Sequence, residues 1–139
     1  MPLLPKIREL SFLVYGLGVT GRSVVKFLIK NKIKKISIWD DKEVSFLKSL
    51  RPKNLSQAFK QVDFIVLSPG ISLLKNKKLR KFKKKIITDI DLFYLTKDRP
   101  KSIMVTGTNG KSTTCKLLAH LLKKNKYKIF LGGNIGNPI

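Results

Sequence analysis

The sequence predicts an α/β fold in which helices cover a parallel β-sheet. Short apolar runs alternate with amphipathic stretches along the 139 residues, which is the pattern of successive βαβ units. Two glycine-rich loops, at residues 16–21 and 107–110, each lie between a predicted strand and a predicted helix. The polar segment 96–101 suits a linker between the two halves. We therefore expect a first domain over residues 1–96 and the start of a second domain over residues 97–139.

The elements of the first domain follow from the apolar runs and their spacing. Apolar runs predict strands at residues 11–15, 35–39, 64–67 and 86–87. Helical spacing predicts helices at residues 20–30, 44–50 and 90–95, with a weaker helical tendency at 79–82. Asn31 is expected to end the first of these helices, and Pro52 the second.

The second domain restarts the same pattern. Apolar residues predict strands at residues 103–105 and 129–131, on either side of a helix at residues 112–124. That helix carries an apolar stripe made of Leu117, Leu118, Leu121 and Leu122. Each half of the chain therefore combines a strand, a glycine-rich loop and a helix, which is the arrangement of a nucleotide-binding unit.

The chain is strongly basic, with a net charge of +22. Most cations are lysines, whereas arginine is the better residue for bidentate contacts to phosphate or guanine, and no aromatic residues alternate with the lysines as base stacking requires. We therefore predict a solvated lysine surface that attracts anionic nucleotides, and no nucleic-acid binding. No apolar run approaches the roughly 20 residues that span a bilayer, and the first residues do not form a secretory signal. The single cysteine, Cys115, fits a reducing compartment, so we expect a cytoplasmic protein without a membrane contact.

The first glycine-rich loop reads Gly-Leu-Gly-Val-Thr-Gly over residues 16–21. Glycines in this pattern allow a tight turn and a close approach of the backbone to a diphosphate at the positive end of a helix. Asp40 lies at the end of the next predicted strand, where its carboxylate can accept hydrogen bonds from a ribose or a base. Taken alone, this pattern indicates a dinucleotide site, so a stand-alone NAD- or nucleotide-binding regulatory module is one hypothesis.

The second loop and the helical turn after it form a phosphate-binding pattern. The predicted ATP-binding residues are Gly107, Thr108, Asn109, Gly110, Lys111, Ser112 and Thr113. Successive backbone N–H groups in such a loop form a cradle for anions. Lys111 is placed to reach the β- and γ-phosphates, and the Ser112 hydroxyl to coordinate Mg²⁺. The loop is shorter than the usual phosphate loop, because Gly107 stands three residues before Gly110.

That shortened loop resembles the ATP loop of the Mur ligases and of their folylpolyglutamate synthase relatives. Further segments resemble the D-glutamate-adding branch of the Mur ligase family, at residues 16–21, 68–71, 89–93 and 132–136. They occur in the same order and at matching spacing over nearly the whole chain. The resemblance implies an α/β architecture, with a Rossmann-like, parallel-sheet N-terminal domain followed by the beginning of a P-loop ATP-binding central domain.

The resemblance also implies a site for UDP-N-acetylmuramoyl-L-alanine in the first domain. Its expected residues are Leu17, Gly18, Val19 and Thr20 at the diphosphate, Asp40, Asp41 and Lys42 at the uracil end, Gly70 beside the nucleotide, and Asn134 near the reacting end. Residues 41 and 42 depart from the Asp-Thr-Arg that is commoner in the family.

In the family, ATP phosphorylates the muramoyl-alanine carboxylate, and the amine of D-glutamate then attacks the acyl phosphate during the cytoplasmic stage of peptidoglycan synthesis. The resemblance therefore implies an ATP-dependent acid–amino-acid ligase, monomeric at full length, which uses ATP and Mg²⁺ and has Lys111 as a catalytic cation. The family's acidic magnesium ligand, histidine, carbamylated lysine and third domain, which binds the amino acid, would follow Ile139. We therefore expect an N-terminal fragment that is inactive alone.

Other conspicuous residues receive structural interpretations. We expect His120 at the surface, Cys115 in buried packing, and Trp39 in the core or in a pocket wall. Asp89 and Asp91 are expected to start a helix rather than to form a catalytic pair. Two alternatives stay open. An NAD-binding module leaves the second loop unexplained, and a basic nucleic-acid-binding protein explains the charge but neither loop.

Overall fold

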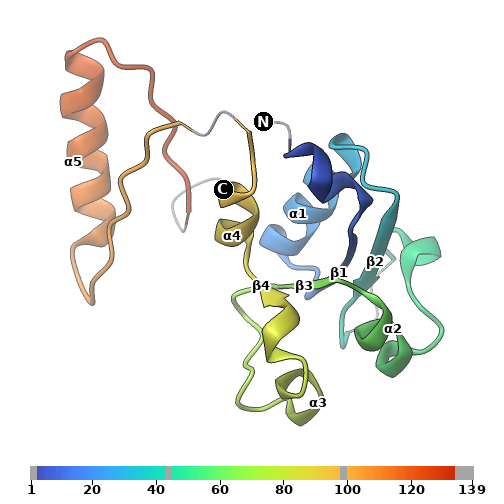
Figure 1. The fold of residues 1–139 in the computed structure, drawn as a ribbon. Coiled ribbons are helices and arrows are strands. Elements are labelled where there is room, and N and C mark those ends of the chain that lie inside the picture. The colour runs from blue at the N-terminus through green and yellow to red at the C-terminus, as the bar shows by residue number, and fades with distance from the viewer. Residues whose placement is uncertain (1–2, 43–44, 98–99, 134–139) are drawn as a thin grey trace. The chain divides into compact units, whose positions relative to one another are not determined.

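The structure, a computed structural model, describes residues 3–42, 45–97 and 100–133. The chain forms two compact units, Met1–Arg99 and Pro100–Ile139, each with an architecture of its own (Figure 1). The first unit holds the β-sheet and most of the helices, and the second holds one long helix.

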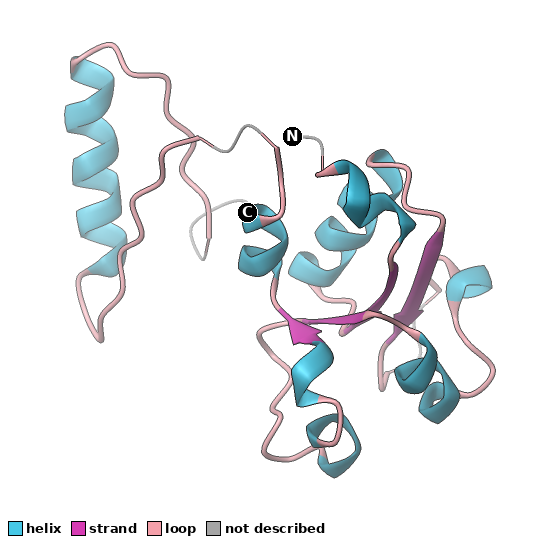
Figure 2. Ribbon diagram, viewed as in Figure 1, coloured by secondary structure: helices cyan, strands magenta, loops and turns pink. Residues whose placement is uncertain are grey.

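The first unit is built around a four-stranded parallel sheet in the order β2-β1-β3-β4 (Figure 2). Its strands are β1 (Ser11–Tyr15), β2 (Lys35–Trp39), β3 (Phe64–Leu67) and β4 (Ile86–Ile87), at the predicted positions. The register aligns Tyr15 with Trp39 of β2 and with Leu67 of β3. Because these strands are parallel and end level with one another, the loops that follow them gather at one edge of the sheet. The α/β parallel-sheet fold expected for the first domain is therefore confirmed.

Helices cover both faces of this sheet (Figure 1). They are α1 (Val19–Lys30) and α4 (Asp89–Tyr94) on one face, and α2 (Leu55–Gln61) and α3 (Lys77–Arg80) on the other. The central strand β1 divides its side chains between the two cores, with Phe12 and Val14 toward α1 and Leu13 and Tyr15 toward α2. All of these side chains are buried, which is why this strand is apolar throughout rather than alternating.

The described residues also form three short 3-10 helices: η1 (Pro5–Glu9) before β1, η2 (Lys48–Leu50) between β2 and α2, and η3 (Lys83–Lys85) between α3 and β4. The helix predicted at residues 44–50 is wrong over most of its length, because only η2 forms there; residue 44 itself lies outside the described residues. Leu47 has a φ of 47° and a ψ of 49°, in the left-handed region. A side chain in that conformation interrupts a right-handed helix, so the apolar spacing of this segment does not continue into helical structure.

Helix α2 is absent from the predictions although its start carries a recognisable signal. The side-chain oxygen of Asn54 accepts a hydrogen bond from the backbone N–H of Gln57 at 3.1 Å, which is a helix N-cap. The helix has seven residues, of which Ala58 and Phe59 are buried. So short a helix shows too few apolar positions for its period to be seen.

Helix α4 begins with a reciprocal cap. The backbone N–H of Thr88 donates to Asp91 Oδ2 at 2.7 Å, and the backbone N–H of Asp91 donates to Thr88 Oγ1 at 3.3 Å. The Asp91 carboxylate is thus used in starting the helix, as predicted for this pair of acidic residues.

The two ends of the described part of this unit lie side by side. Leu3 pairs with Thr96 in an antiparallel bridge, and the N–H of Leu4 donates to the carbonyl of Leu95 at 3.2 Å. The N–H of Leu3 also donates to Asn31 Oδ1 at 2.8 Å. Asn31 therefore ends α1, as predicted, and at the same time holds the beginning of the unit.

Lys85, the last residue of η3 before β4, caps the carboxyl end of α2. Its ammonium donates to the carbonyls of Phe59, Lys60 and Val62 at 3.3, 2.8 and 2.6 Å. The last carbonyls of a helix lack partners within it, so a lysine placed there stabilises the helix end.

We expect Lys85→Met to lower the free energy of unfolding by about 1 kcal/mol, because these carbonyls lose a charged donor while the aliphatic stem remains. Lys84→Met, a change of the exposed neighbour, is the matched control and should shift it by less than about 0.5 kcal/mol. Urea denaturation followed by circular dichroism measures both variants. An equal change in the free energy of unfolding of the two variants would show that the Lys85 cap adds no stability.

The second unit contains α5 (Lys111–Lys124) and no named strand within residues 100–133. The strands predicted at 103–105 and 129–131 are therefore wrong, and the start of a P-loop domain is not formed as a sheet. A strand is completed by hydrogen bonds to a neighbouring strand, which an apolar run does not itself supply. The helix confirms the predicted element, although Leu117 and Leu121 of its stripe are 58% and 48% exposed.

Two smaller expectations concern this helix. Cys115 is half-buried rather than buried, because α5 has no covering partner among the described residues of its unit. His120 is exposed, as expected. Within the part of the chain that the structure describes, no helix has the length and apolar character needed to cross a membrane.

Candidate nucleotide-binding site

The order of the strands reverses between β1 and β3. From β1 the chain adds β2 on one side, and it then crosses back to add β3 and β4 on the other side. In open α/β sheets, ligands bind in the crevice beyond the carboxyl ends of the strands at such a reversal. The loop after β1 is the glycine-rich loop 16–21, and the loop after β3 begins with residues 68–71. Two segments singled out in the sequence therefore flank the place where a ligand is expected.

The fold itself requires Gly16 and Gly21 but not Gly18. Gly16 has a φ of 94°, and a Cβ there would lie 2.8 Å from the Cβ of Ser68. A Cβ on Gly21 would lie 1.8 Å from the carbonyl oxygen of Gly16, because the first turn of α1 rests directly on the loop. Gly18 has an ordinary φ of −66°, and a Cβ there would meet nothing within 4 Å. The space above Gly18 is therefore open to a ligand.

Helix α1 directs its amino-terminal N–H groups toward this open space. Gly18 is the N-cap, and no side chain accepts a hydrogen bond there. Val19, which is 76% exposed, and Thr20, which is half-buried, form the start of the helix. A 12-residue helix without an acidic residue in its first turn carries an uncompensated positive end, which favours an anion such as a diphosphate.

Asp40 fixes the glycine-rich loop from the end of β2. Its Oδ2 accepts a hydrogen bond from the N–H of Leu17 at 2.6 Å, and its Oδ1 accepts one from the N–H of Lys42 at 2.9 Å. The N–H of Leu17, a predicted diphosphate donor, is thus engaged within the protein. Each carboxylate oxygen still has a second lone pair for a ligand, and Asp40 is only half-buried.

The neighbouring Asp41 is also engaged. Its Oδ1 accepts hydrogen bonds from the hydroxyl of Tyr15 at 2.7 Å and from Trp39 Nε1 at 3.2 Å. Burial and the negative Asp41 raise the pKa of Tyr15 to about 12, so the phenol remains a proton donor at neutral pH. The Asp41 side chain is therefore directed toward the end of β1.

Arg51 is a cation near this loop that no sequence motif contains. Its guanidinium lies 4.2 Å from the centre of the Trp39 ring, and its Nη2 donates to the carbonyl of Asp40 at 3.3 Å. Stacking on an aromatic ring holds the guanidinium plane without consuming most of its N–H donors. Only the stacking preference of arginine and tryptophan could have suggested this pair from the sequence.

The loop after β3 contacts the glycine-rich loop directly. Ser68 Oγ donates to the carbonyl of Gly16 at 2.7 Å, and the N–H of Ser68 donates to the carbonyl of Tyr15 at 3.0 Å. Gly70, a predicted contact with the nucleotide, is exposed, and a Cβ there would meet nothing within 4 Å. As at Gly18, the protein itself gives no reason for the missing side chain.

The phosphate loop belongs to the second unit. Gly107 has a φ of 148° and Gly110 a φ of 75°, both in the region that favours glycine. Gly110 is the N-cap of α5, and the ammonium of Lys111 donates to the carbonyls of Gly107 and Thr108 at 2.5 and 3.0 Å. The lysine therefore closes over the loop, where a phosphate would offer stronger acceptors than these carbonyls.

The remaining predicted ATP residues are exposed around the start of α5: Thr108, Asn109, Ser112 and Thr113. The Ser112 hydroxyl can serve as one oxygen ligand of Mg²⁺. The described residues contain no group of three histidine, cysteine or acidic side chains that could hold a metal by themselves. Mg²⁺ is commonly held by few protein groups together with phosphate oxygens and water. The predicted contact Asn134 lies outside the described residues.

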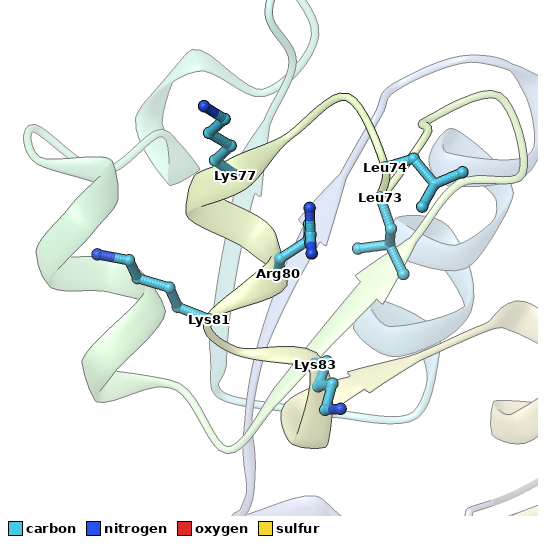
Figure 3. A pocket seen from close by; sticks show the side chains of 6 residues that line it. All are labelled: Leu73, Leu74, Lys77, Arg80, Lys81 and Lys83. Carbon is cyan, nitrogen blue, oxygen red and sulfur yellow. The ribbon is translucent and has the colours of Figure 1, made fainter.

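Two surface hollows of the first unit lie away from the glycine-rich loop. One, of about 520 Å³, is lined by Leu73, Leu74, Lys77, Arg80, Lys81 and Lys83 (Figure 3). The amino groups of its lysines point in different directions and do not converge on one point. The other, of about 590 Å³, includes the first residues of β1 and β2, at the opposite edge of the sheet. Neither hollow forms the nucleotide crevice.

Comparison with known proteins gives a consistent result. Residues 10–90 match the family described as Mur ligase MurD-like, N-terminal domain. The chain is 39% identical to the UDP-N-acetylmuramoylalanine--D-glutamate ligase of Wolbachia sp. subsp. Brugia malayi, with 98% of this chain and 30% of that protein covered. It is 41% identical to the ligase of the same name from Buchnera aphidicola subsp. Acyrthosiphon pisum (strain Tuc7), with 93% of this chain and 31% of that protein covered. It is also 41% identical to the ligase of that name from Rickettsia prowazekii, with 90% of this chain and 30% of that protein covered.

The chain thus spans about 30% of the length of these curated relatives. The family match includes the glycine-rich loop, the end of β2 and the loop after β3, which together flank the strand reversal described above. From this match and from the agreement of the relatives, the chain belongs to the Mur ligase family, in its MurD-like branch.

Proposed function

We propose that this chain supplies the nucleotide-sugar site and the ATP loop of a UDP-N-acetylmuramoylalanine--D-glutamate ligase. The first unit would bind UDP-N-acetylmuramoyl-L-alanine and the second would bind the phosphates of ATP. The complete reaction needs D-glutamate as well, and it belongs to a protein as long as the relatives. We infer a monomeric cytoplasmic enzyme of peptidoglycan synthesis, with this segment inactive alone.

The observation that carries this proposal is the open space above Gly18 at the strand reversal. Gly16 and Gly21 are explained by packing, so they would occur in any protein with this tight turn. Gly18 and Gly70 are not explained in that way, yet they lie on the loops that follow β1 and β3. A backbone that leaves out two side chains around a helix N-terminus is suited to close contact with a diphosphate.

The chemistry proposed for the second unit is phosphoryl transfer to a carboxylate. The carboxylate oxygen of the muramoyl-alanine group attacks the γ-phosphorus, ADP leaves, and the amine of D-glutamate then displaces inorganic phosphate from the acyl carbon and loses a proton. Mg²⁺, when bound, neutralises charge on the phosphates. Lys111 would exchange its contacts with the carbonyls of Gly107 and Thr108 for the transferred phosphoryl group. The Ser112 hydroxyl would orient the metal-bound phosphates.

The alternative from another class is a regulatory module that binds NAD. In dinucleotide sites the acidic residue after the second strand accepts hydrogen bonds from ribose hydroxyls. Here both oxygens of Asp40 already accept backbone N–H groups, one from Leu17 of the loop itself. Each oxygen keeps one lone pair, so Asp40 can accept from a ribose or from a uracil, and what separates the two hypotheses is the phosphate loop at residues 107–110, which an NAD module leaves unexplained. This alternative is retained as an outcome of the experiment below.

We expect the 139-residue chain to bind UDP-N-acetylmuramoyl-L-alanine at least about tenfold more tightly than NAD, a difference of roughly 1.4 kcal/mol. Isothermal titration calorimetry with each ligand measures this preference, and UDP alone shows how much the nucleotide part contributes. Tight NAD binding without a response to the UDP-sugar would contradict the proposal and favour the regulatory module.

A further inference from the structure

A side-chain network joins the three segments in which β1, β2 and β3 end at the strand reversal. The hydroxyl of Tyr15, at the end of β1, donates to Asp41 Oδ1, which follows β2, at 2.7 Å. The same hydroxyl oxygen accepts a hydrogen bond from Asn76 Nδ2, in the loop after β3, at 3.2 Å. Tyr15 is 1% exposed, so its ring cannot move without disturbing the core.

Asn76, the last member of the network, forms hydrogen bonds through both polar atoms of its side-chain amide. The Oδ1 of Asn76 accepts the N–H of Leu79 at 3.1 Å and so caps α3, while its Nδ2 reaches Tyr15. The amide is therefore held in one orientation between a helix and the phenol. Through Tyr15, the position of the loop that contains Gly70 depends on the carboxylate at the end of β2.

We propose that Asp41 is a positioning residue which, through Tyr15 and Asn76, holds the loop after β3 at the correct distance from the glycine-rich loop. This inference rests on the proposed function. Asp40 performs the corresponding task for the glycine-rich loop, through the N–H of Leu17. The two adjacent carboxylates thus divide the work, with Asp40 holding the glycine-rich loop and Asp41 holding the loop after β3.

The physical argument is that the Tyr15 hydroxyl has one proton to donate and gives it to Asp41. A buried phenol without an acceptor is costly, and a hydrogen bond to a charged group is stronger than one between neutral groups. The raised pKa of Tyr15, about 12, fits a phenol that is held as a donor to a carboxylate. Asp41 Oδ1 also accepts from Trp39, so both lone pairs of this oxygen are in use, while Oδ2 of this exposed residue faces solvent or a ligand.

A double-mutant cycle separates this positioning role from direct contact with the base. Tyr15→Phe removes the hydroxyl and leaves the Asp41 carboxylate free to meet a ligand. If Asp41 acts through Tyr15, Tyr15→Phe and Asp41→Ala should each weaken binding of UDP-N-acetylmuramoyl-L-alanine by about five- to tenfold, and the double variant no further. Asp41→Asn keeps an oxygen that can accept the phenol proton, so it should restore part of the affinity. Tyr127→Phe, at an exposed position of the second unit, is the control and should bind as the wild type.

Amide hydrogen exchange tests the same network without any ligand. Tyr15→Phe and Asp41→Ala should both accelerate exchange of the N–H of Leu79 and of the loop residues before it, by the same factor. Normal binding by Tyr15→Phe together with weak binding by Asp41→Ala would overturn the proposal, because Asp41 would then contact the ligand itself. Unchanged exchange in both variants would overturn it as well. If the two variants show the exchange effects but the wild-type chain binds no UDP-sugar, the proposed function is refuted and the network is a structural one only.

Discussion

Replacement of Gly21 by alanine should destabilise the first unit by on the order of 3 kcal/mol or more. The Cβ would lie 1.8 Å from the carbonyl oxygen of Gly16 and 2.9 Å from Ser68 Oγ. Alanine inside a helix ordinarily gains about 1 kcal/mol over glycine, so the sign depends on whether the clash exceeds that gain. A backbone oxygen cannot move aside as a flexible side chain does, and overpacking of this kind typically costs 1–3 kcal/mol, occasionally more. The clash should therefore dominate.

Gly18→Ala is the matched control for this prediction. Its Cβ would meet nothing within 4 Å, so stability should fall by no more than about 1 kcal/mol, the usual cost of alanine at an N-cap. The same variant should nevertheless weaken binding of the UDP-sugar, because the methyl group would occupy the space proposed for the diphosphate. Denaturation curves give the free energy of unfolding of both variants, and calorimetric titrations give their affinity for the UDP-sugar. Near-normal stability of Gly21→Ala would show that α1 does not rest on the loop as closely as described.

Lys111→Ala should lower kcat/KM by about 10²-fold or more in an active ligase that contains this segment. Removal of a preorganised donor from a developing negative charge typically costs about 10²–10³ in rate. Lys111 is held by the carbonyls of Gly107 and Thr108 and contributes little to packing, so the loss should not arise from unfolding. Steady-state release of phosphate, measured at saturating UDP-sugar and D-glutamate, reports the effect.

Lys116→Ala is the appropriate comparison, since Lys116 is an exposed lysine of the same helix, beyond its first turn. It removes the same charge from α5 and should leave kcat/KM within about twofold of the wild type, an energy difference of roughly 0.4 kcal/mol. If both variants lost activity equally, the general basic field of the chain would be responsible. If neither did, Lys111 would not be the phosphate ligand.

The first unit could be predicted from the sequence where a local pattern determines the structure. The strands of the sheet were found because each is an apolar run between turn residues, and α1 because its apolar residues repeat with a helical period. Helix α2 lacked such a period and depended on the cap at Asn54. The strands expected in the second unit did not form, because a ladder needs a partner that no local pattern can guarantee.

The site was predictable only in part, for a similar reason. The two glycine-rich loops and Asp40 are motifs, so their residues could be named in advance. The contact between Tyr15 and Asn76 joins residues 61 positions apart, and that between Tyr15 and Asp41 joins residues 26 apart. Such contacts depend on the strand order, which the sequence pattern did not specify. The two hydrogen bonds that Asp41 Oδ1 accepts could be seen only in the folded structure, where β1, β2 and β3 lie next to one another.

The pairing of Leu3 with Thr96 has a consequence for the topology of the first unit. The two ends of its described part meet, since Leu3 and Leu4 pair with Thr96 and Leu95. Because these ends are neighbours, we expect a circular permutant to fold. In it, a short linker would join the two ends, and the new termini would lie in an exposed loop away from the loops that follow β1 and β3. The loops that follow β1, β2 and β3 would keep their positions in such a rearranged chain. The integrity of the first unit therefore depends on the contact between its two ends rather than on which residue comes first in the chain.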